Sequence, residues 1–163
     1  MKYLTIVRHA KSSWENPDLD DLVRPLNERG VQSIKIIGNY LEEKQILPDL
    51  VITSPATRAL QTAIGIGTYL NYTADDLLIK QDIYFGNPTS IFSILKNLND
   101  DFNDVILFGH EPILSSLIEL LTKNQLDKFP TCAVYRIAFD INHWNAIKKG
   151  KMVFFVTPKQ LTV

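Results

Sequence analysis

The 163-residue chain is 45% hydrophobic, which excludes a disordered protein and is sufficient for one domain with a sizeable core. Its formal net charge of -1 shows no basic excess, so nothing in the composition indicates a general nucleic-acid binder. The single cysteine, Cys132, excludes an internal disulfide and is typical of a reducing compartment.

The first predicted element is a buried strand at 3–7, with the sequence YLTIV. Arg8 and His9 end its apolar run, which is therefore too short for the core of a signal peptide. No later stretch approaches the length of a membrane span. We therefore expect a cytoplasmic protein without a membrane segment, folded as a single domain over residues 1–163.

Helices and strands alternate through the middle of the chain. After a polar loop at 11–25, Asn27 is expected to cap a helix with inward positions Val31, Ile34, Ile37 and Leu41. A strand is predicted at 49–54, and Ser54 and Pro55 are expected to be the N-cap and first residue of a helix that ends near Leu70.

The second half continues the same alternation. A weak strand is predicted at 77–80, a helix from Asn87 and Pro88, and a strongly apolar strand at 104–109, followed by a helix from Pro112. Two further strands are predicted at 133–139 and 151–156, with a turn at 148–150 before the last one. This order predicts a three-layer α/β/α sandwich with a mostly parallel central sheet.

Basic or imidazole side chains follow three of these strands. Arg8 and His9 follow the first, Arg58 lies in the first turn of the helix after the second, and His110 follows the strand at 104–109. Parallel strands deliver their carboxyl ends to one edge of a sheet, where ligands bind. We therefore expect these four side chains to converge.

Such a cluster is suited to phosphoryl chemistry. Two guanidinium groups can clamp a phosphate, and helix N-termini favour an anion. A histidine beside fixed cations resists protonation, and a neutral imidazole is a nucleophile towards phosphorus. Each of these residues alone would more often have a structural role. The occurrence of basic or imidazole side chains at three strand ends is the basis for predicting a phosphate site. His143 lies away from those ends and is interpreted as a surface residue.

Three segments resemble the histidine phosphatase superfamily, the phosphoglycerate mutase-like proteins. RHAKS at 8–12 is similar to its RHG signature, SPATRALQTA at 54–63 to its second-arginine segment, and FGHEP at 108–112 to its second-histidine segment. DLVRPLNERG at 21–30 and TPKQL at 157–161 resemble elements of the short SixA-like phosphohistidine phosphatases.

The resemblance implies roles for particular residues. His9 is the nucleophile, and Arg8, Arg58 and His110 bind the phosphate and stabilise the transition state. Ser12, at the end of RHAKS, is a further candidate for substrate binding. Asp21 and Arg24 match an element that we interpret as a structural ion pair.

Two residues depart from the wider pattern. Ala10 replaces the glycine of the RHG signature, a change that the SixA-like subgroup tolerates. Glu15 stands where mutases carry an asparagine that binds phosphate, and its charge would repel a second phosphate group. This difference argues against mutase activity.

Relatives that act on alkyl phosphates carry a carboxylic acid between the second arginine and the second histidine, because a leaving alkoxide needs a proton. In the segment at 79–90 the only carboxylate is Asp82, which is either a catalytic acid or an ordinary turn residue. Phosphohistidine needs less assistance, since its imidazole can leave neutral once the distal nitrogen is protonated.

The leading hypothesis is a phosphatase for phosphohistidine on proteins such as phosphorelay domains, acting through a phosphohistidine intermediate. The alternatives are a phosphatase for small metabolites or phosphosugars, and a phosphate-binding module without activity. We expect no cofactor and no metal, because three histidines without an H-E-x-x-H motif make a poor ligand set. The partners expected are a phosphoprotein or a phosphorylated metabolite, with no nucleic acid and no membrane. The oligomeric state is left open.

Overall fold

The computed structural model describes residues 1–162, whose strands form one mixed sheet of six. In chain order the strands are β1 (Lys2–Arg8), β2 (Leu50–Thr53), β3 (Leu77–Ile79), β4 (Asp104–Gly109), β5 (Val134–Phe139) and β6 (Lys151–Val156). The α-helices are α1 (Glu28–Glu43), α2 (Thr57–Leu70), α3 (Asp82–Phe85), α4 (Pro88–Lys96), α5 (Ile113–Thr122) and α6 (Pro158–Leu161). Short 3-10 helices are η1 (Asp21–Val23), η2 (Ala74–Asp76) and η3 (Trp144–Ala146).

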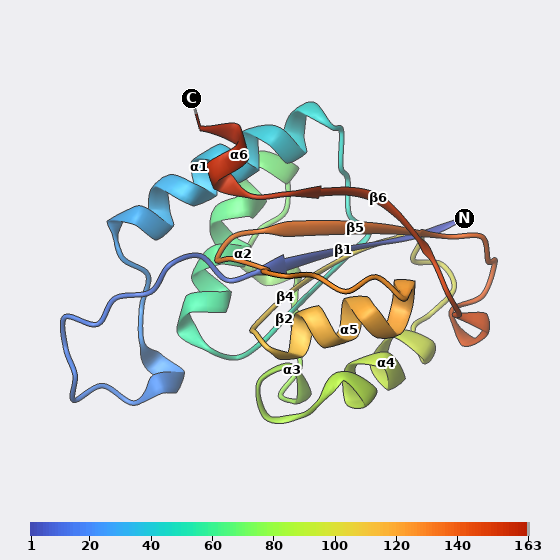
Figure 1. Cartoon of the computed structure of the whole chain (residues 1–163), viewed down its shortest axis with the longest axis horizontal. Coiled ribbons are helices and arrows are strands. Elements are labelled where there is room, and N and C mark those ends of the chain that lie inside the picture. The colour runs from blue at the N-terminus through green and yellow to red at the C-terminus, as the bar shows by residue number, and fades with distance from the viewer. Residues whose placement is uncertain (163) are drawn as a thin grey trace.

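The strand order across the sheet is β3–β2–β4–β1–β5–β6. The neighbours β3, β2, β4 and β1 run parallel, whereas β5 is antiparallel to β1 and β6 is antiparallel to β5 (Figure 1). The predicted mostly parallel sheet is therefore confirmed. Its parallel half brings the carboxyl ends of β1, β2 and β4 to the same edge.

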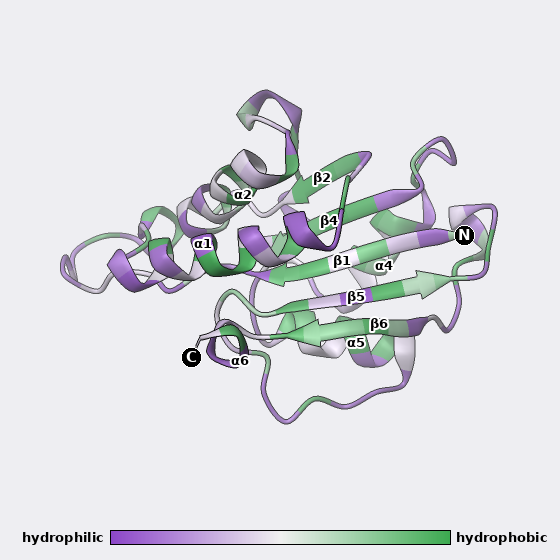
Figure 2. Ribbon diagram, turned by 90° about the horizontal axis from the view of Figure 1, so that it is seen from above, coloured by the Kyte–Doolittle hydropathy of each residue, from purple (hydrophilic) through white to green (hydrophobic). Residues whose placement is uncertain are grey.

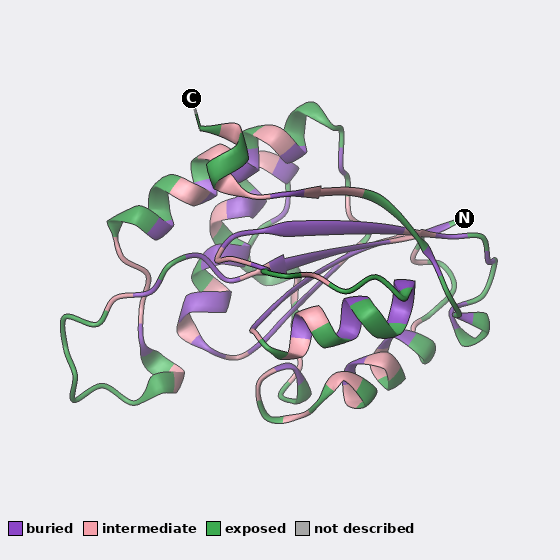
Figure 3. Ribbon diagram, viewed as in Figure 1, coloured by how far each residue is buried: buried purple, intermediate pink, exposed green. Residues whose placement is uncertain are grey.

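Helices cover both faces of the sheet, which gives three layers (Figure 1). Alternate residues of β4 face opposite sides: Val105 and Leu107 pack in the cluster that includes α4 and α5, and Ile106 and Phe108 in the cluster that includes α1 and α2. The central strands are apolar and buried, while the outer faces of the helices are polar and exposed (Figures 2 and 3). Burial on both faces explains why these strands are continuous apolar runs.

Helix α1 begins as predicted, because the Asn27 side chain accepts a hydrogen bond from Gly30 N at 2.9 Å. The predicted inward face is wrong at Val31, which is 49% exposed. Successive helical residues are about 100° apart, so Val31 lies about 90° from the centre of the stripe formed by Ile34, Ile37 and Leu41. Those three side chains are buried.

Helix α2 begins later than predicted, at Thr57, and Ala56 is its N-cap. Ser54 N still donates to the β4 residue Phe108 at 3.1 Å, so the backbone follows the sheet and cannot yet turn into a helix. The Ser54 hydroxyl instead accepts from Ala56 N at 3.1 Å. Arg58 nevertheless lies in the first turn of α2, as expected from the sequence.

Candidate active site

A cavity of about 360 Å³ lies where β1, β2 and β4 end. Its lining residues are Arg8, His9, Lys11, Ser12, Trp14, Arg24, Arg58, His110, Glu111 and Thr131. The structure therefore brings together the four side chains that follow the three strands. Four of the lining residues are cations and one is a carboxylate, so the cavity is suited to an anion.

The backbone after β1 is held from several sides. His9 N donates to Gly109 O at 3.0 Å, and Ala10 N donates to the Thr62 hydroxyl at 2.9 Å. The Cys132 amide donates to His9 O at 3.1 Å from a left-handed backbone with φ of 60°. These contacts fix the direction in which the His9 ring leaves the strand end.

The His9 ring is oriented by its own backbone. Nδ1 lies 2.7 Å from Ala10 O, and because a carbonyl oxygen only accepts, Nδ1 carries the proton. The lone pair is therefore on Nε2. Burial, together with smaller effects of the charges of Arg58 and Arg8, lowers the pKa of His9 to about 4. The expected neutral imidazole is found, although burial is a larger cause than the cations on which the expectation was based.

His110 lies beside His9, with ring centroids 5.1 Å apart and an angle of 49° between the planes. Its Nε2 lies 2.7 Å from the hydroxyl of Ser54, which follows β2. Burial lowers the pKa of His110 to about 3, with His9 and Arg58 adding to the effect. Both imidazoles are therefore neutral near pH 7.

Three arginines surround the cavity and differ in what holds them. Arg8 Nη1 donates to Phe129 O at 3.1 Å, and Arg58 donates to the backbone of Asp21 at 2.6 Å. The Nε atoms of Arg8, Arg24 and Arg58 are buried and have no hydrogen-bond partner among the described residues. Buried donors are nearly always satisfied in folded proteins, so these groups favour a bound acceptor such as a phosphate oxygen.

Asp21 links two of these arginines. Its carboxylate accepts from Arg24 and from Arg58, both at 2.9 Å, and from the Tyr84 hydroxyl at 2.6 Å. The Tyr84 hydrogen bond and then the two arginines hold the pKa of Asp21 well below its usual range. The predicted pair with Arg24 is present, and the link to Arg58 makes Asp21 part of the support of the cavity.

Ser12 lies in the loop that forms one wall of the cavity, and its hydroxyl accepts a hydrogen bond from Arg24. The start of α1 supports this loop. A Cβ atom on Gly30 would lie 2.3 Å from Lys11 O, so only glycine permits this close approach. Arg24 also stacks on the Trp14 ring, with its guanidinium carbon 3.8 Å from the ring centroid.

Asp82 is not brought into the cavity. It is the first residue of α3 and lines a separate hollow together with Lys80 and Ser90. The turn of α3 directs Tyr84 towards the site instead, where its ring lies 5.3 Å from that of His110. Of the two interpretations of Asp82, a catalytic acid or an ordinary turn residue, this position favours the second.

The sequence interpretation missed Tyr84, Ser54 and Glu111 as neighbours of the site. Glu111 follows His110 directly in FGHEP, so its position beside a candidate residue was the available signal. The contact of Tyr84 with Asp21 joins residues 63 positions apart and leaves no pattern in a single sequence. His143 is 66% exposed at its side chain, lies against Asp100 and is a surface residue as interpreted.

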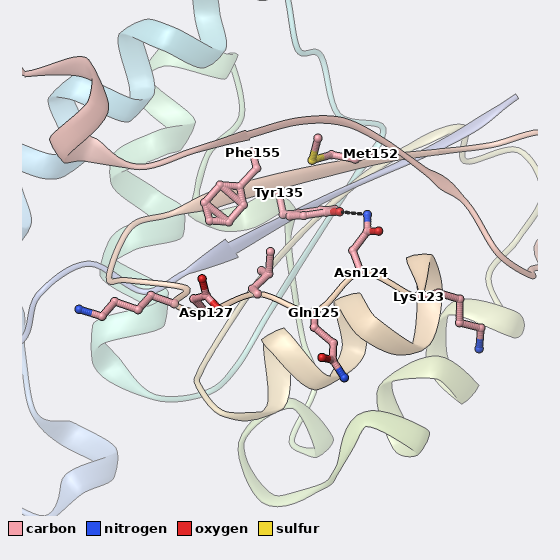
Figure 4. A pocket seen from close by; sticks show the side chains of 9 residues that line it. Lys123, Asn124, Gln125, Asp127, Tyr135, Met152 and Phe155 are labelled. Atoms are coloured by element: carbon pink, nitrogen blue, oxygen red, sulfur yellow. Dashed lines mark hydrogen bonds between the residues drawn. The ribbon is translucent and has the colours of Figure 1, made fainter.

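A larger hollow of about 910 Å³ lies beside β5 and β6, and we call it the β6 groove (Figure 4). Its lining residues are Lys123, Asn124, Gln125, Leu126, Asp127, Lys128, Tyr135, Met152 and Phe155. The Asn124 amide donates to the Tyr135 hydroxyl at 2.9 Å, as drawn in Figure 4. None of the described residues that line the groove is a histidine or an arginine, so the smaller cavity is the candidate active site.

Neither a membrane segment nor a metal cluster is found in the described part of the chain. None of the helices within residues 1–162 combines the length and the hydrophobicity needed to cross a bilayer. Over the same residues, no group of three or more His, Cys, Asp or Glu side chains is arranged to hold a metal ion.

The chain is similar to proteins of a known family. The family model described as "Histidine phosphatase superfamily (branch 1)" matches residues 4–87. An uncharacterised protein of Mycobacterium tuberculosis is 30% identical over 170 residues, covering 94% of this chain and 100% of that protein. Phosphohistidine phosphatase SixA of Escherichia coli is 26% identical over 137 residues, covering 83% of this chain and 84% of SixA.

A solved structure has the same fold. The protein histidine phosphatase SixA complexed with tungstate superposes with a TM-score of 0.87, at 23% identity, covering 98% of this chain and 99% of that one. The three-layer architecture is therefore that of a known α/β fold.

Proposed function

This chain belongs to the histidine phosphatase superfamily, and from that premise we propose that it hydrolyses phosphohistidine on proteins through a phosphohistidine intermediate of its own. Its similarity to SixA over most of both chains supports a phosphatase of this kind. The observation that carries the proposal is the state of His9, a buried neutral imidazole with its lone pair on Nε2 inside a cationic cavity.

The proposed reaction has two transfers. His9 Nε2 attacks the phosphorus, a P–N bond forms to His9, and the P–N bond of the substrate breaks with its electron pair going to the leaving imidazole. Water then attacks the phosphoryl group on His9, which releases phosphate and returns the electron pair to Nε2. Arg8 and Arg58 neutralise the equatorial oxygens in both transition states.

The position of Asp82 outside the cavity favours a substrate whose leaving group is an imidazole. Asp82, the one carboxylate of its segment, lines a different hollow, so it is not available to protonate an alkoxide. The imidazole of phosphohistidine leaves as a neutral group when its distal nitrogen already carries a proton, so no carboxylic acid is required. Phosphate esters of sugars or metabolites have more basic leaving groups and gain less from this site.

A protein-borne phosphoryl group also suits the surroundings of the cavity. Trp14 lies at its rim and is 73% exposed, although its ring stacks on the buried Arg24. An exposed aromatic ring beside a basic cavity is typical of a surface that contacts a partner protein.

The test is a side-by-side measurement of kcat/KM. The substrates are a phosphorelay domain phosphorylated on histidine and a panel of phosphoserine, 3-phosphoglycerate and glucose phosphates, with His9→Ala as the inactive control. We expect the phosphohistidine protein to be the preferred substrate. A higher kcat/KM for a metabolite would support the small-molecule phosphatase instead, and binding without turnover would support a phosphate-binding module.

A further inference from the structure

Glu111 is the one carboxylate among the described residues that line the cavity. It follows His110 directly, at the turn between β4 and α5. Its backbone position therefore depends on the same strand end as the second histidine.

The side chain of Glu111 is held in a definite position. Its Oε1 atom accepts a hydrogen bond from Ser115 N, in the first turn of α5, at 2.7 Å. Oε2 has no such partner in the described part of the chain. One oxygen therefore fixes the carboxylate and the other is left to accept a hydrogen bond.

The charge of Glu111 acts on the neighbouring arginine. Burial lowers the pKa of Arg8, and the charge of Glu111 is the strongest influence in the opposite direction. The charge of Arg58 lowers the same pKa. Glu111 therefore lines the same cavity as Arg8 and Arg58, and its charge acts on Arg8 within it.

An ionised carboxylate beside a phosphate site selects among leaving groups. It repels the phosphate oxygens and holds no proton for an alkoxide, so it hinders the hydrolysis of alkyl esters. It accepts a hydrogen bond from a ring N–H and favours the protonated form of an imidazole. The same charge therefore helps only a leaving group that brings its own proton.

We propose that Glu111 is a specificity-determining residue that accepts a hydrogen bond from the distal ring N–H of the substrate phosphohistidine. In the first transfer the substrate enters with this nitrogen protonated and its other nitrogen bonded to phosphorus. His9 Nε2 forms the new P–N bond, the old P–N bond breaks, and its electron pair stays on the leaving nitrogen. The distal proton remains on the ring, hydrogen-bonded to Glu111, and a neutral imidazole departs. This role rests on the proposed phosphohistidine phosphatase activity.

Glu111→Gln separates this role from that of a helix cap. The glutamine carbonyl still accepts from Ser115 N, and the substitution changes little but the charge. We expect kcat/KM on free phosphohistidine to fall by about 10- to 100-fold, which is the loss of one hydrogen bond to a charged group. On p-nitrophenyl phosphate, whose leaving group needs no proton, kcat/KM should stay the same or rise.

Asp82→Asn is the matched control, because it neutralises a carboxylate outside the cavity and should change neither rate. An equal loss on both substrates in Glu111→Gln would show that Glu111 only supports the fold, and no loss on either would also overturn the proposal.

A change in the substrate tests the same contact without altering the protein. A phosphoimidazole methylated at the distal nitrogen has no N–H to donate. The measured quantity is the rate acceleration, which is the rate with wild-type enzyme divided by the uncatalysed rate. This acceleration should be at least about 10-fold smaller for the methylated compound than for phosphoimidazole. Equal accelerations would overturn the role of Glu111 even if Glu111→Gln failed to fold. A wild-type protein that hydrolyses p-nitrophenyl phosphate but not phosphohistidine would overturn the proposed function, and the role of Glu111 with it.

Discussion

The cavity at the strand ends and the β6 groove differ in size and in what lines them. The groove is larger, at about 910 Å³ against about 360 Å³, and has apolar side chains such as Met152 and Phe155 in its wall. The cavity is lined by cations and imidazoles that are held by hydrogen bonds to the backbone. The cavity is therefore proposed as the active site because its charges are fixed and desolvated, and not because of its volume.

The difference follows from the topology of the sheet. Parallel strands β1, β2 and β4 end at one edge, so residues from positions 8 to 110 meet there. The groove lies against the antiparallel strands β5 and β6, whose ends point in opposite directions. Only the parallel half can collect several strand ends in one place.

The largest expected effect is on the nucleophile of the cavity. His9→Ala should abolish turnover while the protein stays folded, because His9 Nε2 supplies the attacking lone pair in the proposed reaction. An acid-labile, alkali-stable phosphoenzyme should be trapped in the wild type and be absent in the variant. Met152→Ala, in the β6 groove, should keep wild-type activity on a small substrate. Substantial turnover by His9→Ala would contradict the assignment of the nucleophile.

The second effect concerns Arg58. Arg58→Ala should lower kcat/KM by roughly 30- to 10³-fold, a loss of about 2–4 kcal/mol of transition-state stabilisation, which is the usual result of losing one preorganised donor. Lysine should restore little, because a point charge cannot replace the planar fork that also binds Asp21. Lys128→Ala removes a cation from the groove and should have no comparable effect. A wild-type rate for Arg58→Lys would show that no fork is needed.

A smaller effect is expected on the pH dependence of the free energy of unfolding, to which the cavity contributes through His9. The pKa of His9 is about 4 in the folded protein, below the value of about 6.5 expected when unfolded. The unfolded state therefore binds more protons in this interval, so the free energy of unfolding should decrease as the pH falls from about 6.5 to 4. His110 acts in the same direction.

Urea unfolding of the wild type and His9→Gln at several pH values measures this effect. The variant should lose less stability on acidification, whereas Tyr135→Phe, in the groove, should show the wild-type slope. Identical slopes for His9→Gln and the wild type would mean that His9 titrates normally.

The smallest expected effect is that of a chelator. EDTA should leave kcat unchanged, because Arg8, Arg24 and Arg58 already supply the positive charge that a divalent ion would otherwise provide. Activity is measured before and after exhaustive dialysis against EDTA. A loss that one particular metal restores would contradict this prediction.

Much of the fold could be predicted from local patterns. The strand at 104–109 and the Asn27 cap are confirmed, because an apolar run and a capping side chain act over a few residues. The predicted start of α2 at Ser54 was wrong, because the Ser54 backbone remains hydrogen-bonded to the neighbouring strand β4. That bond depends on a residue more than 50 positions away and has no local signal.

The site could be predicted in part, because local patterns also locate the strands whose ends form it. The convergence of His9, Arg58 and His110 follows from strand polarity, which the alternation of elements reveals. Asp82 lies outside the cavity and Glu111 lines it, because of how α3 and the turn after β4 are oriented, and only the folded chain determines this orientation.

The hydrogen bond from His9 Nδ1 to Ala10 O determines the regiochemistry of any phosphoryl group carried by this ring. With Nδ1 occupied by its proton, phosphorus can bond only to Nε2, the tele nitrogen. The proposed enzyme-bound intermediate is then a single positional isomer, 3-phosphohistidine rather than 1-phosphohistidine, and antibodies that discriminate between the two isomers would recognise it as such. One backbone carbonyl thus defines the chemical identity of the intermediate before any substrate binds.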